Sequence, residues 1–259
     1  MDWAGTVVDH GCRGPAAVFM DVFADHGITL TLAETRKHMG LKKKDHLRKL
    51  CALPSLKAQW QNIHGHMPTE QEIDQLYIEL ESNMLKTLER HGEPIPGAIE
   101  AVARFREMGL KIGSCTGYTR SMMDVLEPVA KKKNYVPDVV ICSSDVPAGR
   151  PLPWMCWLNA IRLEIYPLRT MVKIGDTVND IQEGLNAGMW TIGLSRTGNE
   201  LGLSVDEVKA VDDDHLESLL VEVASKFNQE GAHFVVQSLA DCPDIITRID
   251  RRLAMGQHP

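Results

Sequence analysis

Four short motifs hold side chains that could handle a phosphoryl group. The chain starts with Asp-Trp-Ala-Gly-Thr at residues 2–6, where an aspartate carboxylate precedes a turn. The glycine lets the backbone turn sharply beside a bound anion, and Thr6 could offer its hydroxyl to a phosphoryl oxygen. Three further motifs follow in order: residues 115–118 (Cys-Thr-Gly-Tyr), Lys173 with Gly-Asp-Thr at 175–177, and Asp180. Together they predict a site in which Asp2 attacks phosphorus.

Composition excludes several classes of protein. The 259-residue chain has a net charge of -7 and a pI of about 5.8, and its basic runs are short. It therefore lacks the basic stripe of a nucleic-acid binder. No apolar run of membrane-spanning length occurs, so no membrane partner is expected. The six cysteines are scattered without a CxxC pair, which is typical of reduced thiols in the cytoplasm.

Two patterns of secondary structure follow one another. Residues 12–91 show helical periodicity and almost no strand signal, whereas strand and helix alternate from about residue 94. Expected strands lie at 110–114, 139–142, 171–174 and 191–194, with a late edge strand at 233–236 and a final helix at about 241–254. This alternation predicts an α/β fold with a doubly wound parallel sheet and a helical cap inserted after the first loop. Ligands of such sheets bind at the carboxyl ends of strands, where Asp2, Thr116 and Asp176 would lie.

Four segments resemble one family. Residues 2–6, 39–46, 116–120 and 145–151 are similar to motifs of the haloacid dehalogenase superfamily, and within it to the phosphonoacetaldehyde hydrolases, or phosphonatases. The resemblance implies a Rossmann-like core at residues 1–10 and 92–259 and a helical cap domain at 11–91. In this family the nucleophile follows an apolar strand. Only Met1 precedes Asp2 here, so the first core strand is expected to be missing.

The resemblance also implies roles for site residues. Asp2 would be the nucleophile and would bind Mg²⁺ together with the Ala4 carbonyl, Asp176 and Asp180. Thr116 and Gly117 would bind phosphoryl oxygens, and Arg150 would supply the cation, which leaves Lys173 simply flanking its strand. Residues matched to the substrate pocket or to its junction with the cap are Cys12, Met39, Gly40 and Tyr118.

The basic segment of the cap is open to two interpretations on spacing alone. If residues 36–50 are helical, Met39, Lys43 and His46 share one face. That face fits either a solvated basic helix with a packed methionine or a site in which adjacent ammonium groups lower the pKa of one lysine. The register of the family selects Lys43 as a Schiff-base lysine, with His46 as acid and base and Met39 also catalytic.

Ala4 restricts the reaction. Phosphatases and mutases of the superfamily carry a second aspartate two residues after the nucleophile, where it protonates an oxygen leaving group. Alanine cannot do so, and a carbon leaving group activated elsewhere would fit. The resemblance therefore implies hydrolysis of the C–P bond of phosphonoacetaldehyde to acetaldehyde and phosphate, through a Lys43 Schiff base and an Asp2 aspartyl phosphate.

Alternatives and partners complete the expectations. The rival functions are a phosphatase of the same superfamily acting on a phosphate ester, and a truncated, inactive chain. The family resemblance implies a homodimer formed through the cap. Trp60, Ile63 and Tyr77 could serve that contact, although packing in the cap core would explain them equally well.

Overall fold

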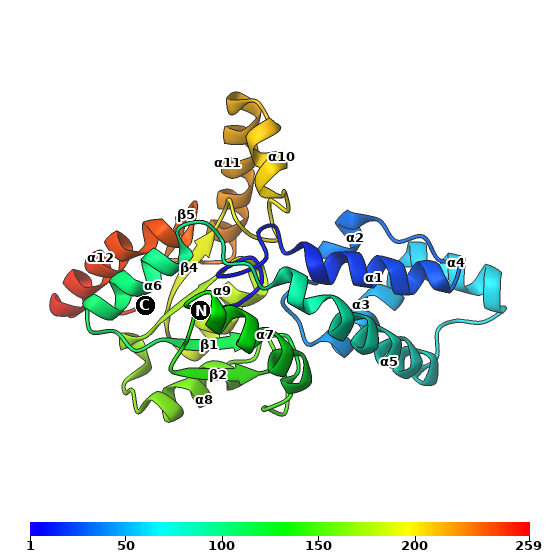
Figure 1. The fold of residues 1–259 in the computed structure, drawn as a ribbon, viewed down its shortest axis with the longest axis horizontal. Coiled ribbons are helices and arrows are strands. Elements are labelled where there is room, and N and C mark those ends of the chain that lie inside the picture. Colours follow the sequence, from blue (N-terminus) through cyan, green and yellow to red (C-terminus); the bar gives the residue numbers. More distant parts are fainter.

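The computed structural model describes residues 1–259 and consists of a parallel sheet with helices on both faces, from which a group of helices extends to one side (Figure 1). The strands are β1 (Gly113–Thr116), β2 (Val139–Cys142), β3 (Val172–Gly175), β4 (Trp190–Leu194) and β5 (Phe234–Val236). The helices of the sheet region are α6 (Ala98–Glu107), α7 (Arg120–Lys132), α8 (Trp154–Leu163), α9 (Val178–Ala187), α10 (Val205–Ala210), α11 (Asp213–Gln229) and α12 (Cys242–Ala254), with short 3₁₀ turns η2 (Leu168–Thr170) and η3 (Leu239–Asp241).

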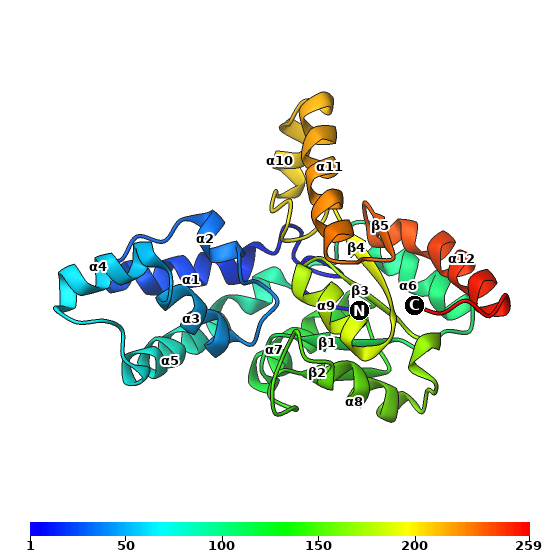
Figure 2. The same cartoon turned by 180° about the vertical axis from the view of Figure 1, so that it is seen from behind.

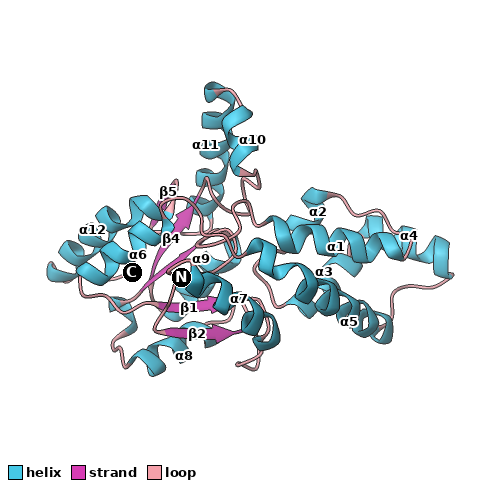
Figure 3. Cartoon of the chain, in the orientation of Figure 1, coloured by secondary structure: helices cyan, strands magenta, loops and turns pink.

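The extending group contains only helices and turns (Figure 3). It comprises α1 (Arg13–Asp25), α2 (Leu32–Arg36), α3 (Lys43–Cys51), α4 (Pro54–His64), α5 (Glu70–Thr87) and the 3₁₀ turn η1 (Leu88–His91). A capping box between Thr69 and Glu72 starts α5. The apolar faces of α1 and α5 pack together. Trp60 is buried at 2% exposure in this small core, so its role is packing.

The sheet forms in two parts that only the first two residues join. One part has the order β1-β2 and the other β3-β4-β5, with all pairs parallel. Between them the Met1 amine donates to the Gly113 carbonyl at 2.8 Å, and the Cys115 amide donates to the Met1 carbonyl at 3.0 Å. The Asp2 amide donates to the Ile174 carbonyl on β3 at 3.0 Å. Met1 and Asp2 therefore hold the central position of the sheet.

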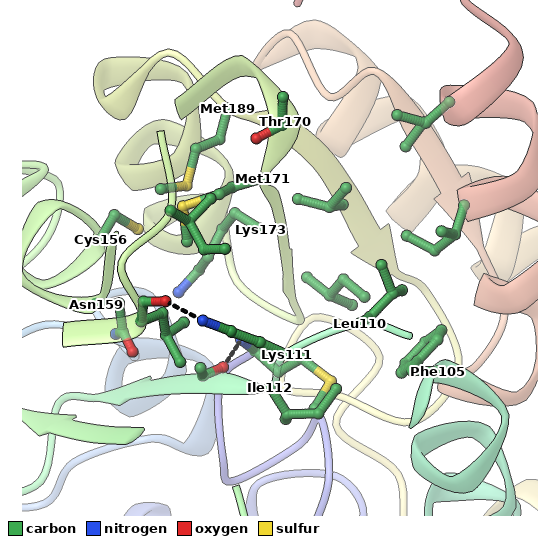
Figure 4. Close-up of a pocket in the computed structure, with 18 of the residues that line it drawn as sticks. Phe105, Leu110, Lys111, Ile112, Cys156, Asn159, Thr170, Met171, Lys173 and Met189 are labelled. Atoms are coloured by element: carbon green, nitrogen blue, oxygen red, sulfur yellow. Dashed lines mark hydrogen bonds between the residues drawn. The ribbon is translucent and has the colours of Figure 1, made fainter. Parts of the chain in front are cut away.

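A groove continues from Met1 between β1 and β3. It encloses about 170 Å³ and is lined mainly by apolar side chains (Figure 4), among them Leu110, Ile112 and Met171. Backbone groups alternate in direction along a strand, and Gly113 and Ile174 already face Met1 and Asp2. Val172, two residues before Ile174, therefore also points its backbone into the groove. The groove therefore lies along the edges of β1 and β3, beyond the bonds that Met1 and Asp2 make to them.

Two layers of helices cover the sheet. Helices α8 and α9 contact β1 to β4 on one face, seen from behind in Figure 2. Helices α6, α7 and α12 cover the other face, and their buried side chains belong to the large hydrophobic core that includes Trp3. This two-sided arrangement confirms the predicted doubly wound α/β fold.

Strand boundaries differ most from expectation beside the groove, and β4 and β5 differ by one residue at their starts. The pattern predicts strands at 139–142 and at 233–236 and a final helix at 241–254, and β2, β5 and α12 confirm them. The strand expected at 110–114 instead begins at Gly113. The preceding Ile112 amide donates to the Asp138 carboxylate at 2.6 Å and so bonds to a side chain rather than to a strand. The third strand is likewise displaced by one residue, to Val172–Gly175.

Candidate active site

The carboxyl ends of the strands meet the base of the helical group at a small enclosed cavity of about 20 Å³. Its lining includes predicted site residues from five separate stretches of the chain, namely Asp2, Ala4, Cys12, Met39, Gly40, Lys43, Thr116, Gly117, Tyr118 and Arg150. Pro15 and Thr177 also line it, and the sequence did not single them out as pocket residues. His46, Asp176 and Asp180 lie outside the lining. The fold thus brings most of the predicted site together.

Three aspartates lie close together at the site, of which only Asp2 lines the cavity. Asp2, Asp176 and Asp180 are all buried, and one carboxylate oxygen from each lies within 4.8 Å of the others. Burial raises the pKa of Asp176 well above its usual range, and the nearby charges of Asp2 and Asp180 raise it further. Such a cluster of hard oxygen donors with excess negative charge suits a divalent cation of the magnesium type. The residues present therefore fit the metal that the sequence predicts.

Asp176 is held from two sides. The Thr6 hydroxyl donates to its Oδ1 at 2.9 Å, and the Asn199 amide donates to its Oδ2 at 2.8 Å. Gly5 has φ of 84°, and a Cβ there would lie 2.1 Å from Asp176 Oδ2. Thr6 therefore orients a carboxylate, which corrects the expectation that its hydroxyl serves a phosphoryl oxygen.

Asp180 divides its two oxygens between a helix cap and two cations. Its Oδ2 accepts from the Thr177 hydroxyl at 2.6 Å in the capping box that starts α9. Its Oδ1 lies 2.9 Å from Lys173 Nζ and 3.2 Å from an Arg150 nitrogen. Although burial raises the pKa of Asp180, Arg150 and Lys173 outweigh it and bring it down to about 2.

Lys173 does more than flank its strand, contrary to expectation. It is 2% exposed, and its Nζ donates to Glu183 Oε2 at 2.7 Å as well as pairing with Asp180. Neither glutamate nor lysine could remain charged at this depth without such partners. Burial raises the pKa of Glu183 to about 7, and the charge of Cys115 adds to this, whereas Lys173 and Arg150 oppose it.

Arg150 reaches the predicted nucleophile. Its Nη2 donates to Asp2 Oδ1 at 2.8 Å and to the Cys115 carbonyl at 3.0 Å. Its Nη1 donates to the Gly40 carbonyl at 3.3 Å, which connects the core to the cap loop. Burial raises the pKa of Asp2, and the Arg150 charge opposes that rise. The guanidinium thus lies where a phosphoryl group on Asp2 would need a cation.

Lys43 approaches from the cap side. It is 4% exposed, and its Nζ lies 4.9 Å from the centre of the Tyr118 ring. Burial lowers the pKa of Lys43, which favours the free amine. The prediction that neighbouring lysines lower the pKa of Lys43 is wrong. Lys44 forms an ion pair with Asp74, and burial of Lys43 has the largest effect on its pKa.

The predicted helix over residues 36–50 is also wrong in part. Helix α3 begins only at Lys43, because Gly40 takes a φ of 87° that a helix cannot contain. Met39 therefore lies in the preceding turn, where its carbonyl accepts from Asn179 Nδ2 at 2.7 Å. Its side chain packs with Cys12 and Ala16 to form an apolar wall of the cavity. Met39 and Lys43 meet through a turn rather than along one helix face.

His46 lies one helical turn beyond Lys43 and is fully buried. Its Nε2 donates to the Thr35 carbonyl at 2.8 Å, and its Nδ1 is buried without a hydrogen-bond partner. Burial lowers the pKa of His46 well below its usual range, and the charge of Lys43 lowers it further. The ring is therefore neutral and keeps one free nitrogen that can accept a proton.

Glu183 is the ionisable neighbour of the site that the sequence did not indicate. It stands three residues after Asp180, so both lie on the same side of α9. The three-residue spacing could have indicated that Glu183 lies near the site, because two carboxylates on the buried side of a helix require cationic or hydrogen-bonding partners.

Comparison with known proteins agrees with this geometry. The profile of the haloacid dehalogenase-like hydrolases matches residues 1–188. A phosphonoacetaldehyde hydrolase-like protein of Syntrophobacter fumaroxidans is 51% identical over the whole chain and 94% of its own length. A phosphonoacetaldehyde hydrolase of Nitratidesulfovibrio vulgaris is 50% identical over the whole chain and 92% of its own length.

A solved structure supports the same assignment. The crystal structure of a phosphonoacetaldehyde hydrolase-like protein from Oleispira antarctica matches with a TM-score of 0.98 at 36% identity, over the whole chain and 94% of that structure. The chain therefore belongs to the haloacid dehalogenase-like hydrolase family and, within it, to the phosphonoacetaldehyde hydrolases.

Proposed function

We propose that this protein hydrolyses the C–P bond of phosphonoacetaldehyde to acetaldehyde and phosphate. The observation that carries the proposal is one buried cavity lined by a lysine amine and an aspartate carboxylate, with Ala4 in place of a second acid. An amine can activate an aldehyde, and a carboxylate can accept a phosphoryl group. The names of the relatives, which match the chain over its full length, support the same substrate.

Lys43 begins the reaction. Its buried Nζ, whose lowered pKa favours the free amine, attacks the aldehyde carbon, and loss of water gives a protonated imine. The electron pair of the C–P bond then moves into the imine, which forms an enamine instead of a bare carbanion. His46, neutral and with Nδ1 free, takes and returns the protons of these steps, directly or through water.

Asp2 receives the phosphoryl group. Arg150 holds Oδ1, which leaves Oδ2 to attack phosphorus and form an aspartyl phosphate. Thr116, Gly117 and Arg150 bind the phosphoryl oxygens. Water then releases phosphate from Asp2, and the enamine is protonated at carbon to give an imine of acetaldehyde. A second water hydrolyses this imine, which frees acetaldehyde and Lys43 and offsets the water lost when the first imine formed.

Mg²⁺ is the metal that we assign to this site. Asp2, Asp176 and the Ala4 carbonyl would hold it, and Asp180 would complete its surroundings. When bound, it would neutralise charge on the phosphoryl oxygens. The raised pKa of Asp176 supports this assignment, because a cation would relieve the crowding of three buried carboxylates.

Residues 11–91 act as a mobile cap on a core of residues 1–10 and 92–259 in this proposal. The cavity of about 20 Å³ has room for about one water molecule, so the substrate must enter a more open form. Closure would bring Lys43 to Asp2 and exclude water. Closure would form two hydrogen bonds to the cap loop, from Asn179 to the Met39 carbonyl and from Arg150 to the Gly40 carbonyl.

Two further assignments remain proposals. We assign the protein to the cytoplasm, which its six unpaired cysteines favour. No helix in the structure has the length and apolar character needed to cross a bilayer. We also propose a homodimer through the cap, where Ile63 is half exposed while Trp60 is buried. Light scattering in solution measures that state directly.

Acetaldehyde release from phosphonoacetaldehyde with Mg²⁺ tests the function. We expect the protein to release acetaldehyde and Lys43→Ala to fall to background, because no other amine lines the cavity. Lys42→Ala is the matched control and should stay active, since Lys42 only precedes α3. Borohydride added with substrate should trap a covalent adduct on Lys43, visible by mass spectrometry.

The rival functions give different results. A phosphatase acting on esters would release phosphate from a phosphate ester, and Lys43→Ala would keep that activity. An inactive chain would release neither product and form no trapped adduct. Either result would refute the proposed function.

A further inference from the structure

A buried cluster of ionisable groups lies beneath the active site and has no part in the proposed chemistry. It contains Lys173 on β3, Glu183 on α9 and Cys115 on β1, each at most 2% exposed. Cys115 and Lys173 also line the groove shown in Figure 4. Lys173 Nζ lies 2.9 Å from Cys115 Sγ and 2.7 Å from Glu183 Oε2. Because removing these charges from water costs free energy that their ion pairs only partly return, the cluster is unlike one selected for stability alone.

Glu183 connects this cluster to the active site. Its Oε2 accepts from Arg150 Nε at 2.9 Å as well as from Lys173 Nζ, so one oxygen lies between two buried cations. At the other end of the same guanidinium, Nη2 donates to Asp2 Oδ1 at 2.8 Å. A guanidinium is planar and rigid, so fixing Nε also fixes the direction of Nη2.

We propose that Glu183 is a positioning residue, which aims the Arg150 guanidinium at the phosphoryl group carried by Asp2. The identity of that anion rests on the proposed function. Glu183 is not among the residues that line the cavity and makes no hydrogen bond to Asp2, and the contact that links it to Asp2 is the one with Arg150.

The arrangement around Asp180 shows why a positioning group is needed. Asp180 Oδ1 lies 3.2 Å from Arg150 Nη2 and 2.9 Å from Lys173 Nζ, and thus competes with Asp2 for the same guanidinium nitrogen. Glu183 accepts a hydrogen bond from Arg150 Nε, and its negative charge offsets the repulsion between Arg150 and Lys173. Without the charge of Glu183, Lys173 repels Arg150, and Asp180 is the remaining carboxylate that pairs with both cations. The guanidinium would then turn from Asp2 toward Asp180.

Glu183→Gln is the decisive variant, because it keeps the shape of the side chain and removes its charge. Assays at pH 8 keep the native Glu183 largely ionised, since its pKa is about 7. We expect kcat to fall about 10–100-fold, the range typical of residues that orient a functional group. The Kd for inorganic phosphate with Mg²⁺, by calorimetry, should rise about tenfold. The rate of borohydride trapping at Lys43 should not change, because Glu183 does not contact the cap.

Cys156→Ala is the matched control. Cys156 lies in α8 next to the same cluster, with its Sγ within 4.8 Å of Cys115 Sγ and a Glu183 oxygen, but it makes no hydrogen bond to Arg150 and carries no part of the Glu183–Arg150 contact. Its truncation should leave kcat and phosphate affinity near those of the unmodified protein. Glu183→Asp, which retains the charge on a shorter side chain, should recover part of the loss in kcat.

Three outcomes would overturn the inference. Unchanged kcat and phosphate affinity in a folded Glu183→Gln protein would show that Arg150 needs no such anchor. An equal loss in Lys43 trapping would indicate a general structural role. Absence of phosphate binding by the unmodified protein would reject Arg150 as the anion site and this inference with it. Failure of the proposed function alone would appear differently, as no acetaldehyde but intact phosphate binding that depends on Glu183.

Discussion

Charges alternate along the path from the sheet interior to the cavity. Lys173 lies between Glu183 and Asp180, and Arg150 lies between those carboxylates and Asp2. Each buried charge has an opposite charge within hydrogen-bonding distance, which is what allows it to remain ionised. Asp176 and Lys43 are exceptions. Asp176 is held by the Thr6 hydroxyl and the Asn199 amide, whereas no carboxylate forms an ion pair with Lys43. Its neighbours are aromatic rings, which suits an amine that must be free to react.

Lys43 should reduce the stability of the protein. Burial lowers its pKa, so the unfolded chain binds the proton more readily than the folded chain does. Stability then rises with pH between the lowered pKa and the ordinary value of 10.5, and the penalty is complete below that window. We expect Lys43→Met to raise the Tm at pH 7 by roughly 2–6 °C, and by less near pH 10.

Thermal unfolding followed by circular dichroism at the two pH values measures this effect. Lys44→Met, one residue along the helix, should change Tm little, because Lys44 is only partly buried and pairs with Asp74 at the surface. A Tm at pH 7 that is unchanged or lower in Lys43→Met would contradict the argument.

At the scale of elements, one turn fixes how the cap meets the core. Gly40 has φ of 87°, and a Cβ there would lie 2.6 Å from Thr177 Oγ1 at the start of α9. A Cβ on Gly117 would similarly lie 2.7 Å from the Leu41 carbonyl. Bare backbone on both sides therefore allows the loop before α3 to approach the core closely. The position of Lys43, the first residue of α3, depends on this approach.

Gly40→Ala should therefore lower kcat/KM at least about tenfold, since small displacements of a reacting group are costly. Gly65→Ala provides the control. Gly65 has a similar φ of 79° but no atom near its Cβ position, so only the backbone strain is shared. Backbone strain should cost each variant roughly 1–2 kcal/mol of unfolding free energy, and Gly40→Ala should lose more because its Cβ meets Thr177. Steady-state kinetics with normal kcat/KM in Gly40→Ala would show that the close approach is not required.

At the scale of the whole molecule, the sheet depends on two residues for its centre. Met1 and Asp2 bridge β1 and β3, and the groove beyond them leaves part of both strand edges without a strand neighbour. The Met1 amine is buried there, which lowers its pKa. Asp2, the proposed nucleophile, therefore lies beside the end of this groove.

Joining a five-residue segment of valine and isoleucine to the Met1 amine should raise the Tm. The added backbone would bond to both strand edges at roughly 0.5–1.5 kcal/mol for each hydrogen bond, and the side chains would fill an apolar groove. An extension of the same length made of glycine and serine is the control and should raise the Tm far less. Equal Tm values for the two extensions, by calorimetry, would mean that the groove does not accept a strand.

The sequence by itself determined the fold class, the order of the elements and most of the residues around the cavity. Strand and helix periodicity is a property of residues close together in the chain, so the sequence records it directly. The same holds for motifs such as those at residues 2–6 and 145–151, whose residue types stand next to one another. Ala4 was informative for the same reason, because a single residue type at one position excludes one kind of acid catalysis.

Only the tertiary structure decided what depends on contacts between distant residues. It placed Lys173 and Glu183 around Arg150, assigned Thr6 to Asp176, and began α3 at Lys43 rather than before Met39. It also attributed the lowered pKa of Lys43 to burial rather than to its lysine neighbours. Burial and ion pairing arise when separate elements pack together, such as Thr6 with Asp176 or Arg150 with α9, and no local pattern in the chain records that packing.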